Sequence, residues 1–180
     1  MASTGVNLRV APTVSLKASQ LAALKRFLEA AYDEPFVEDW DHALGGVHFL
    51  IEEGDDVLAH ASVVERWLET ELKRLRTGYV EAVATRPDRQ RAGFGSRVMQ
   101  RASDYIRAEF ELGGLSTGEN AFYARFGWET WRGPTFVRTS DGLERTAGED
   151  GSVMILRTPL TPSLNLAESI SCEWRAGDVW

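Results

Sequence analysis

Residues 79–110 read YVEAVATRPDRQRAGFGSRVMQRASDYIRAEF, and this stretch decides the fold. Tyr79–Ala84 is apolar apart from one acid, which predicts a strand. In Ser96–Phe110 the apolar residues recur at steps of three and four, which predicts an amphipathic helix. Gln90–Gly95 joins the two elements. The first N–H groups of a helix have no partner inside it and its dipole is positive there, so we expect this segment, with two neighbouring arginines, to bind an anion of diphosphate size.

Two common phosphate-binding motifs are excluded in this segment. A dinucleotide-binding turn needs a third glycine three residues after Gly95, but Val98 stands there. A P-loop needs a lysine after its last glycine, and this segment has none.

The rest of the chain alternates between helical and strand periods. Before residue 79 we expect helices at Leu16–Tyr32, N-capped by Ser15 or Ser19, and at Asp39–Ala43, then a hairpin of strands at Val47–Ile51 and Val57–Val64. After residue 110 we expect a helix at Asn120–Phe126 and strands at Leu112–Leu115, Glu129–Trp131, Phe136–Val137, Val153–Leu156 and Ser169–Trp174.

Three segments have no clear pattern. Residues 1–14 lack a period, so we expect a flexible N-terminal segment; Glu65–Thr77 fits either a continued strand or an exposed loop; and Thr139–Gly151 is predicted to be a polar loop. The order of elements predicts an α/β chain of the α+β type, a single domain over residues 1–180, with a central, mostly antiparallel mixed sheet and helices on both faces.

Composition excludes several classes of protein. The 180 residues carry 20 Lys and Arg against 27 Asp and Glu, and a net charge of −7 argues against a general nucleic-acid binder. No apolar run approaches the ~20 residues of a membrane span, and the start of the chain lacks a signal-peptide pattern, so we expect a cytoplasmic protein. The lone Cys172 excludes an internal disulfide framework and a cysteine zinc site, and the three histidines lack metal-ligand spacing, so we expect no metal.

Charge is unevenly spread along the chain. Glu29–Asp56 holds ten acids and no Lys or Arg, whereas Arg86–Glu109 holds six arginines and three acids. Ser140–Trp180 is again acidic, with seven acids and three arginines. These regions are either solvated surface or the walls of two sites that take ligands of opposite charge.

Two motifs together resemble the GNAT superfamily of N-acetyltransferases. Gln90–Gly95 matches its acetyl-CoA motif, and Asn120–Trp128, read as NAFYARFGW, matches a second family pattern. The resemblance implies acetyl-CoA as co-substrate and a sheet whose fourth and fifth strands splay apart to admit the pantetheine arm. It implies these cofactor-binding residues: Ala82, Val83, Ala84, Gln90, Arg91, Ala92, Gly93, Phe94, Gly95, Ser96 and Asn120.

Four further segments are similar to the aminoglycoside 2′-N-acetyltransferases: Trp40–His48, Gly78–Ala82, Trp131–Thr135 and Cys172–Trp180. This closer resemblance implies transfer of an acetyl group to the 2′-amine of a small cationic amino-sugar antibiotic, which confers resistance. It also implies a homodimer.

The resemblance implies three catalytic residues. Glu81 is the base, acting through ordered water, and Tyr123 is the general acid that protonates the CoA sulfur. Ser116 is a helper near the thiol, as is the neighbouring Thr117. A buried acid paired with arginine, packing of a short helix and ordinary turn use are the structural alternatives for these positions. The acids and terminal residue expected to bind the substrate are Asp33, Glu34, Glu149, Asp150, Asp178 and Trp180, the last through its carboxylate.

One departure affects the substrate. Pro35 stands where the relatives have an aspartate, and the segment up to Trp40 is one residue shorter. This leaves ordinary 2′-amino aminoglycosides and kasugamycin, which has an inositol in place of the deoxystreptamine ring, as competing substrates. An acetyltransferase for another small amine, such as a polyamine or a biosynthetic amino sugar, and a non-catalytic module that binds acetyl-CoA or drug also stay open.

Overall fold

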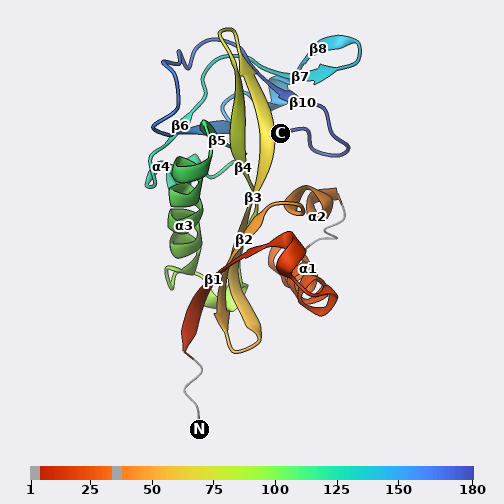
Figure 1. The fold of residues 1–180 in the computed structure, drawn as a ribbon, viewed down its shortest axis with the longest axis vertical. Helices are drawn as coiled ribbons and strands as arrows, with labels where there is room; N and C mark the ends of the chain where they lie inside the picture. The colour runs from red at the N-terminus through yellow and green to blue at the C-terminus, as the bar shows by residue number, and fades with distance from the viewer. Residues whose placement is uncertain (1–4, 34–37) are drawn as a thin grey trace. The chain divides into compact units, whose positions relative to one another are not determined.

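The computed structural model describes residues 5–33 and 38–180, and two long strands run through its fold: β3 (Asp56–Thr70) and β4 (Arg74–Thr85) (Figure 1). The chain forms two compact units. The first comprises residues 1–64 and 80–102, and the second comprises residues 65–79 and 103–180. Strands β3 and β4 therefore contribute residues to both units, as does helix α3 (Phe94–Glu109).

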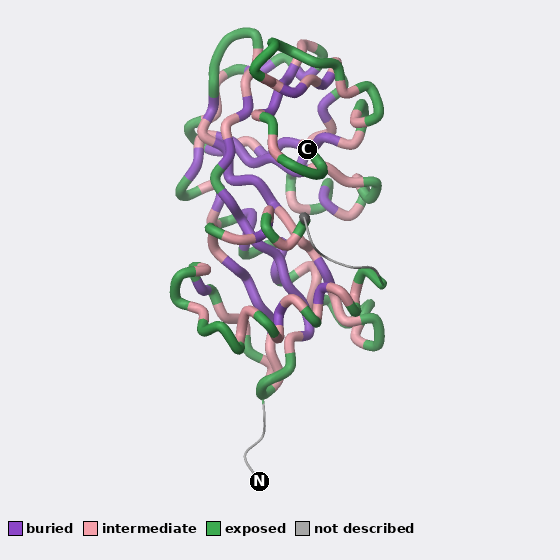
Figure 2. The backbone as a smooth tube through the Cα atoms, turned by 90° about the vertical axis from the view of Figure 1, so that its right-hand side faces the viewer, coloured by how far each residue is buried: buried purple, intermediate pink, exposed green. Residues whose placement is uncertain are grey.

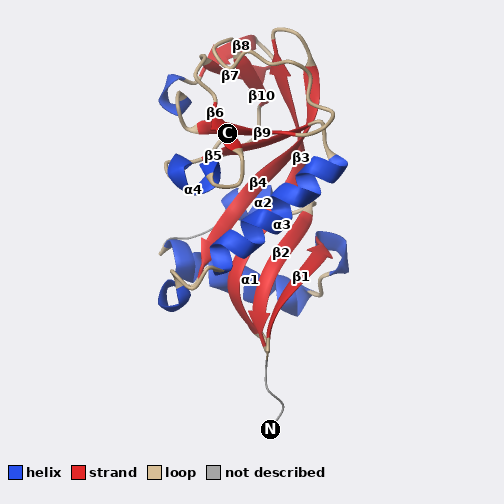
Figure 3. Cartoon of the chain, turned by 90° about the vertical axis from the view of Figure 1, so that its left-hand side faces the viewer, coloured by secondary structure: helices blue, strands red, loops and turns tan. Residues whose placement is uncertain are grey.

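The first unit is an antiparallel sheet covered by helices. Strand β1 (Val6–Pro12) pairs along its whole length with β2 (Val47–Glu53), and β2 pairs with β3. Helices α1 (Ala18–Tyr32) and α2 (Glu38–Ala43) lie on one side of these strands and the start of α3 on the other (Figures 1 and 3). Leu24 and Leu28 of α1 pack on Leu50 and Ala84 in the core.

The second unit extends the β3–β4 hairpin on both sides. One side adds β5 (Leu112–Ser116), β9 (Val153–Arg157) and β6 (Trp128–Thr130). The other adds β10 (Ile170–Glu173), β7 (Thr135–Thr139) and β8 (Gly142–Arg145). Helix α4 (Asn120–Ala124) follows β5. The buried residues concentrate on the strands, as the purple segments of Figure 2 show.

The parallel pair β4–β5 is short and its strands then splay. Pairing covers Thr77↔Leu112 to Tyr79↔Gly114, although β4 continues to Thr85. Gly78, Gly113 and Gly114 lie in this pairing, and a Cβ at each would come within 2.9 Å of a neighbouring side chain. At Gly113 a Cβ would lie 2.7 Å from Cβ of Leu156 and 3.0 Å from the Trp128 ring. The splay that the family resemblance implied is present.

Most of the expected elements are confirmed, and the differences have physical causes. Residues 6–12 form β1 rather than a flexible segment: Val6, Leu8 and Val10 alternate with polar residues, a strand pattern too short to stand out in the sequence, and the strand pairs along its whole length with β2. Glu65–Thr77 is resolved as the continued β3, a short turn and the start of β4. The predicted loop at 139–151 contains the exposed strand β8, which pairs with β7.

The predicted N-caps of the first helix are wrong. Helix α1 begins after Lys17, whose backbone N–H donates to Oε1 of Gln20 at 3.0 Å. Among the described residues, no helix is long and apolar enough to cross a membrane. The single-domain expectation stays a prediction.

We predict that Gly113→Ala lowers the free energy of unfolding by about 1–3 kcal/mol, because the added methyl overpacks a rigid contact with Leu156 and Trp128. Gly118→Ala is the matched control, since a Cβ there meets nothing within 4 Å. We expect it to change stability by less than about 0.5 kcal/mol. Urea denaturation measures both, and equal effects would contradict the packing argument.

Candidate active site

The end of β4 in the first unit is an irregular strand held by side chains. Ala82 has a left-handed backbone with φ 52°, which costs an L-residue about 1–2 kcal/mol. The three carbonyl oxygens around it each accept a side-chain hydrogen bond: Ser62 Oγ donates to Glu81 at 3.4 Å, His60 Nδ1 to Ala82 at 2.7 Å and Tyr32 Oη to Val83 at 2.7 Å. We call residues 81–84, with the left-handed Ala82, the bulge. It contains the predicted base Glu81, which is half-buried, and the predicted pantetheine-pairing residues 82–84.

The predicted diphosphate segment is a solvent-facing turn at the start of α3. Gln90, Arg91, Ala92 and Gly93 are exposed, and Phe94–Ser96 form the first turn of the helix. Arg91 and Gly93 adopt left-handed conformations, with φ of 65° and 82°. Such alternation turns successive N–H groups toward one side and suits an anion. Of the two arginines expected to assist, Arg89 is ion-paired with Glu53, so its charge is partly neutralised.

Two buried histidines lie behind the bulge in the same unit. His60 of β3 and His48 of β2 are fully buried, with their ring centroids 5.2 Å apart. Burial lowers the pKa of His60 to about 3, and the nearby His48 adds to this effect. Burial, with the charge of Arg9, lowers the pKa of His48 to about 4. Both rings are therefore neutral at pH 7.

In the second unit, the predicted general acid Tyr123 lies on α4 and is buried. Burial raises the pKa of Tyr123 to about 12 even though a hydrogen bond with Thr117 lowers it. The phenol therefore keeps its proton throughout the physiological range. A raised pKa also makes the phenol a weaker acid than an ordinary thiol, so transfer of its proton to a departing thiolate is uphill and must be driven by the bond changes of the reaction.

The structure brings together Ser116 and Glu149, which the sequence places in different roles. Ser116 Oγ donates to Oε2 of Glu149 at 2.8 Å. Asn120, at the start of α4, donates from Nδ2 to Thr130 Oγ1 and to the Gly151 carbonyl, both at 2.9 Å. These two contacts occupy the amide N–H groups of Asn120 and connect α4 to β6 and to the loop before β9.

The acids expected to bind substrate have different environments. Asp150 forms an ion pair with Arg145 and accepts from Thr135, and the Arg145 hydrogen bond is the main cause that lowers the pKa of Asp150 to about 2. This carboxylate therefore stabilises the β7–β8 hairpin, because Thr135 belongs to β7 and Arg145 to β8. Asp33 and Asp178 are exposed. Asp33 directly follows Tyr32, which is bonded to Val83, so the end of α1 lies beside the end of β4. Glu34 and the departure at Pro35 lie outside the described residues.

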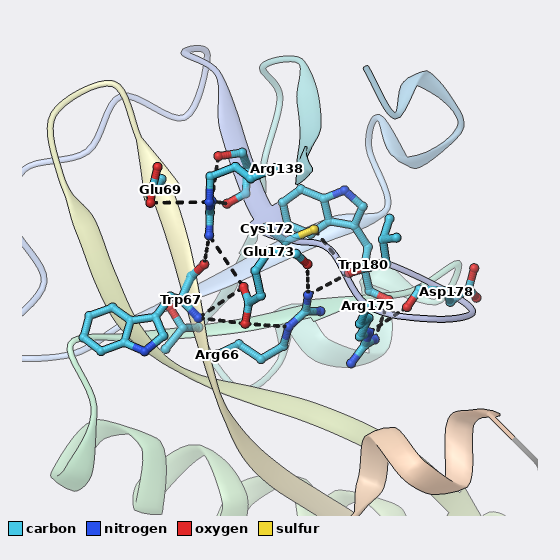
Figure 4. A network of polar contacts seen from close by, with 12 residues as sticks. Arg66, Trp67, Glu69, Arg138, Cys172, Glu173, Arg175, Asp178 and Trp180 are labelled. Atoms are coloured by element: carbon cyan, nitrogen blue, oxygen red, sulfur yellow. Dashed lines mark hydrogen bonds and ion pairs between the residues drawn. The ribbon is translucent and has the colours of Figure 1, made fainter. Parts of the chain in front are cut away.

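The segment after β10 is held by a network of arginines (Figure 4). Arg66 is only 3% exposed, and its Nη2 donates to the carbonyls of Glu173 at 2.9 Å and Val179 at 2.8 Å. Cys172 Sγ donates to the same Val179 carbonyl at 3.2 Å. Arg175 donates to the carbonyl oxygens of Asp178 at 2.6 Å and Trp180 at 3.0 Å. These bonds fix residues 174–180 in a folded-back loop.

Trp180 is buried within this loop rather than extended from it. Its side chain is 5% exposed, and its indole Nε1 donates to Thr146 Oγ1 at 2.9 Å. Sequence reasoning missed Arg66, the centre of the network. The sequence does contain a sign of its burial, because Arg66 alternates with Val64 and Leu68 and so lies on the buried face of β3.

Comparison with known proteins identifies the family of this chain. The model of the acetyltransferase (GNAT) family matches residues 16–128, which include the bulge, the diphosphate segment and Tyr123. The chain belongs to the GNAT family. It is an acetyltransferase, and this family uses acetyl-CoA. The recognition from Gln90–Gly95 and Asn120–Trp128 is confirmed.

GNAT relatives extend the likeness over most of the chain. An aminoglycoside 2′-N-acetyltransferase from Mycolicibacterium fortuitum is 37% identical over 177 residues, covering 96% of this chain and 91% of the relative. Two solved structures share the fold. A GNAT family N-acetyltransferase from Escherichia coli in complex with CoA has a TM-score of 0.65 at 12% identity, covering 93% of this chain and 89% of that one. A GNAT acetyltransferase from Brucella melitensis in complex with acetyl-CoA has a TM-score of 0.62 at 16% identity, covering 94% and 97%.

We predict that the enzyme loses stability in mild acid because of its two buried histidines. The unfolded chain takes up protons near pH 6.5, whereas His48 and His60 stay neutral in the folded state until about pH 4 and 3. Stability is therefore complete above pH 6.5 and falls as the pH drops below it, by about 2–4 kcal/mol between pH 7.5 and 5. Denaturant titrations measure this change. The double variant His48→Gln/His60→Asn should flatten the slope, and an unchanged slope would contradict the assignment.

We predict that Arg66→Met frees residues 174–180, because the carbonyls of Glu173 and Val179 lose their donor. The free energy of unfolding should fall by about 1–3 kcal/mol, and limited proteolysis should cut this segment first. Arg74→Met is the control, since its exposed side chain forms a surface ion pair with Glu69. Equal proteolysis of the two variants would show that Arg66 does not anchor the segment.

Proposed function

We propose that the enzyme transfers the acetyl group of acetyl-CoA to the 2′-amine of an aminoglycoside-type antibiotic and so confers resistance. The observation that carries this proposal is the 37% identity to an aminoglycoside 2′-N-acetyltransferase over 96% of the chain. The identity extends beyond the segment matched by the family model, which ends at residue 128, and so includes the acidic C-terminal third.

The reaction proceeds by direct attack of the amine on the thioester. Glu81 accepts a proton from the substrate ammonium through an ordered water molecule, which leaves a lone pair on nitrogen. The amine adds to the acetyl carbonyl, the nitrogen of the tetrahedral adduct releases its second proton to solvent, the C–S bond breaks, and an amide forms. Tyr123 gives its proton to the departing thiolate, and the phenolate recovers a proton from solvent. The pKa of about 12 makes the protonated phenol the resting form.

Charge supports a polycationic substrate. The chain holds 27 acids against 20 Lys and Arg, and the exposed Asp33 and Asp178 are available to ammonium groups. Carboxylates around a cleft raise the local concentration of such a substrate. Asp150 contributes less, because Arg145 neutralises it. Glu149 is held by Ser116, which keeps its carboxylate oriented.

Thiol release from acetyl-CoA tests the proposal. A 2′-amino aminoglycoside should be acetylated, whereas a matched aminoglycoside with a 2′-hydroxyl should not. Kasugamycin is assayed in parallel, because the shorter segment around Pro35 favours a smaller ring system. Turnover of polyamines in preference to all antibiotics would replace the proposed substrate, and acetyl-CoA binding without turnover of any amine would indicate a non-catalytic module.

We predict that Glu81→Gln and Tyr123→Phe each reduce kcat by about 10²-fold or more, because each removes a proton-transfer group. The affinity for acetyl-CoA should change little. Glu144→Gln on the exposed strand β8 and Tyr105→Phe on α3 are the matched controls and should keep kcat within about twofold. Steady-state kinetics measure these effects, and a wild-type kcat in both site variants would refute the assigned roles.

A further inference from the structure

A chain of hydrogen bonds leads from the turn after β1 to the bulge in β4 through the two buried histidines. Thr13 Oγ1 lies 2.8 Å from His48 Nε2, His48 Nδ1 lies 2.9 Å from His60 Nε2, and His60 Nδ1 lies 2.7 Å from the Ala82 carbonyl oxygen. The register of the β2–β3 pair explains the contact. His48 is opposite Ser62, so His60 is its diagonal neighbour on the same face of the sheet.

The Ala82 carbonyl, the last group in this series of hydrogen bonds, fixes the position of every proton in the series. A carbonyl only accepts, so Nδ1 of His60 carries the hydrogen and its Nε2 must accept. His48 therefore donates from Nδ1, and its own Nε2 accepts from the Thr13 hydroxyl. The Gly45 N–H donates to Thr13 Oγ1 at 3.1 Å, and the hydroxyl hydrogen goes to His48 Nε2 at 2.8 Å in preference to the Gly46 carbonyl, which lies farther away at 3.2 Å. Both rings are neutral Nδ1–H tautomers. If His48 instead donated from Nε2 to Thr13, its Nδ1 lone pair would face the Nε2 lone pair of His60. If both rings changed tautomer, the Nδ1 lone pair of His60 would face the Ala82 carbonyl.

This chain orients groups and does not conduct protons, because the Ala82 carbonyl at its end has no exchangeable hydrogen. It also acts where the backbone needs support. Ala82 is left-handed with φ 52°, and His60 is the donor that holds its carbonyl toward β3. Burying two imidazoles is costly unless their nitrogens are bonded, and an apolar pair would fill the same space without that cost.

We propose that His60, whose tautomer is fixed by the Ala82 carbonyl and whose ring is supported by His48 and Thr13, is a positioning residue that holds the Ala82 bulge and thereby presents residues 82–84 to the pantetheine arm of acetyl-CoA. This inference rests on the proposed function, in which the end of β4 binds that arm. His60 acts through the Ala82 carbonyl and does not itself contact the reacting atoms.

Acetyl-CoA affinity of His60 variants, measured by calorimetry, is the direct test. His60→Leu removes the donor and should weaken binding about tenfold, the value of one lost hydrogen bond. His60→Asn places an amide N–H near the position of Nδ1 and should stay within about threefold of wild type. Thr70→Ala is the matched control on the same strand, since it removes a bond from Thr70 Oγ1 to the Lys73 carbonyl at 3.3 Å, outside the bulge, and it should change affinity less than about twofold.

Variants of Thr13 test the hydrogen-bonded chain at its far end, and they serve if His60→Leu does not fold. Thr13→Val leaves Nε2 of His48 without its donor and so weakens the support of His60, whereas the Ala82 carbonyl is kept. Long-range ¹H–¹⁵N spectra should show both rings as Nδ1–H tautomers in the wild type and in Thr13→Ser. Thr13→Val should weaken acetyl-CoA binding about threefold, and Thr13→Ser should restore it.

The outcomes separate the inference from the function on which it rests. Folded His60→Leu or Thr13→Val that bind acetyl-CoA as tightly as wild type would overturn the inference and leave the proposed function intact. Nε2–H tautomers in the wild type would also overturn it. A wild-type enzyme that does not bind acetyl-CoA would overturn both.

Discussion

The parallel pairing of β4 with β5 ends at Tyr79 and Gly114, and a predicted site residue follows it in each strand, Glu81 in the first unit and Ser116 in the second. Beyond Tyr79, β4 no longer has β5 as a partner, so its carbonyls are held by side chains from β3 and α1 instead. Beyond Gly114, β5 ends at Ser116, which is bonded to Glu149. Gly113 and Gly114 allow the close packing that makes this short pairing possible.

The net charge of −7 conceals two regions of opposite character. The arginine-rich stretch around the start of α3 suits the diphosphate of acetyl-CoA, although Arg89 is partly neutralised by Glu53. The acids of the proposed substrate site also differ from one another. Asp150 is committed to Arg145, whereas Asp33 and Asp178 are exposed. The buried Arg66 has a different role, because its guanidinium anchors residues 174–180 through backbone carbonyls.

Sequence reasoning succeeded where the signal is local. Gln90–Gly95 lies between a strand and a periodic helix, so its place at the start of α3 could be predicted. It failed where the cause is pairing between distant segments. Strand β1 has only a short alternation at Val6, Leu8 and Val10, and its pairing with β2, about 40 residues away, completes it. The His48–His60 contact depends on the β2–β3 register, and the burial of Arg66 depends on Glu173 and Val179, more than 100 residues away.

Backbone amide hydrogen exchange with and without acetyl-CoA tests the central claim, that the end of β4 binds the pantetheine arm. The account predicts that the amides of residues 82–84 become protected when acetyl-CoA binds, while those of the exposed strand β8 do not change. Acetyl-CoA binding that leaves exchange at residues 82–84 unchanged would contradict it.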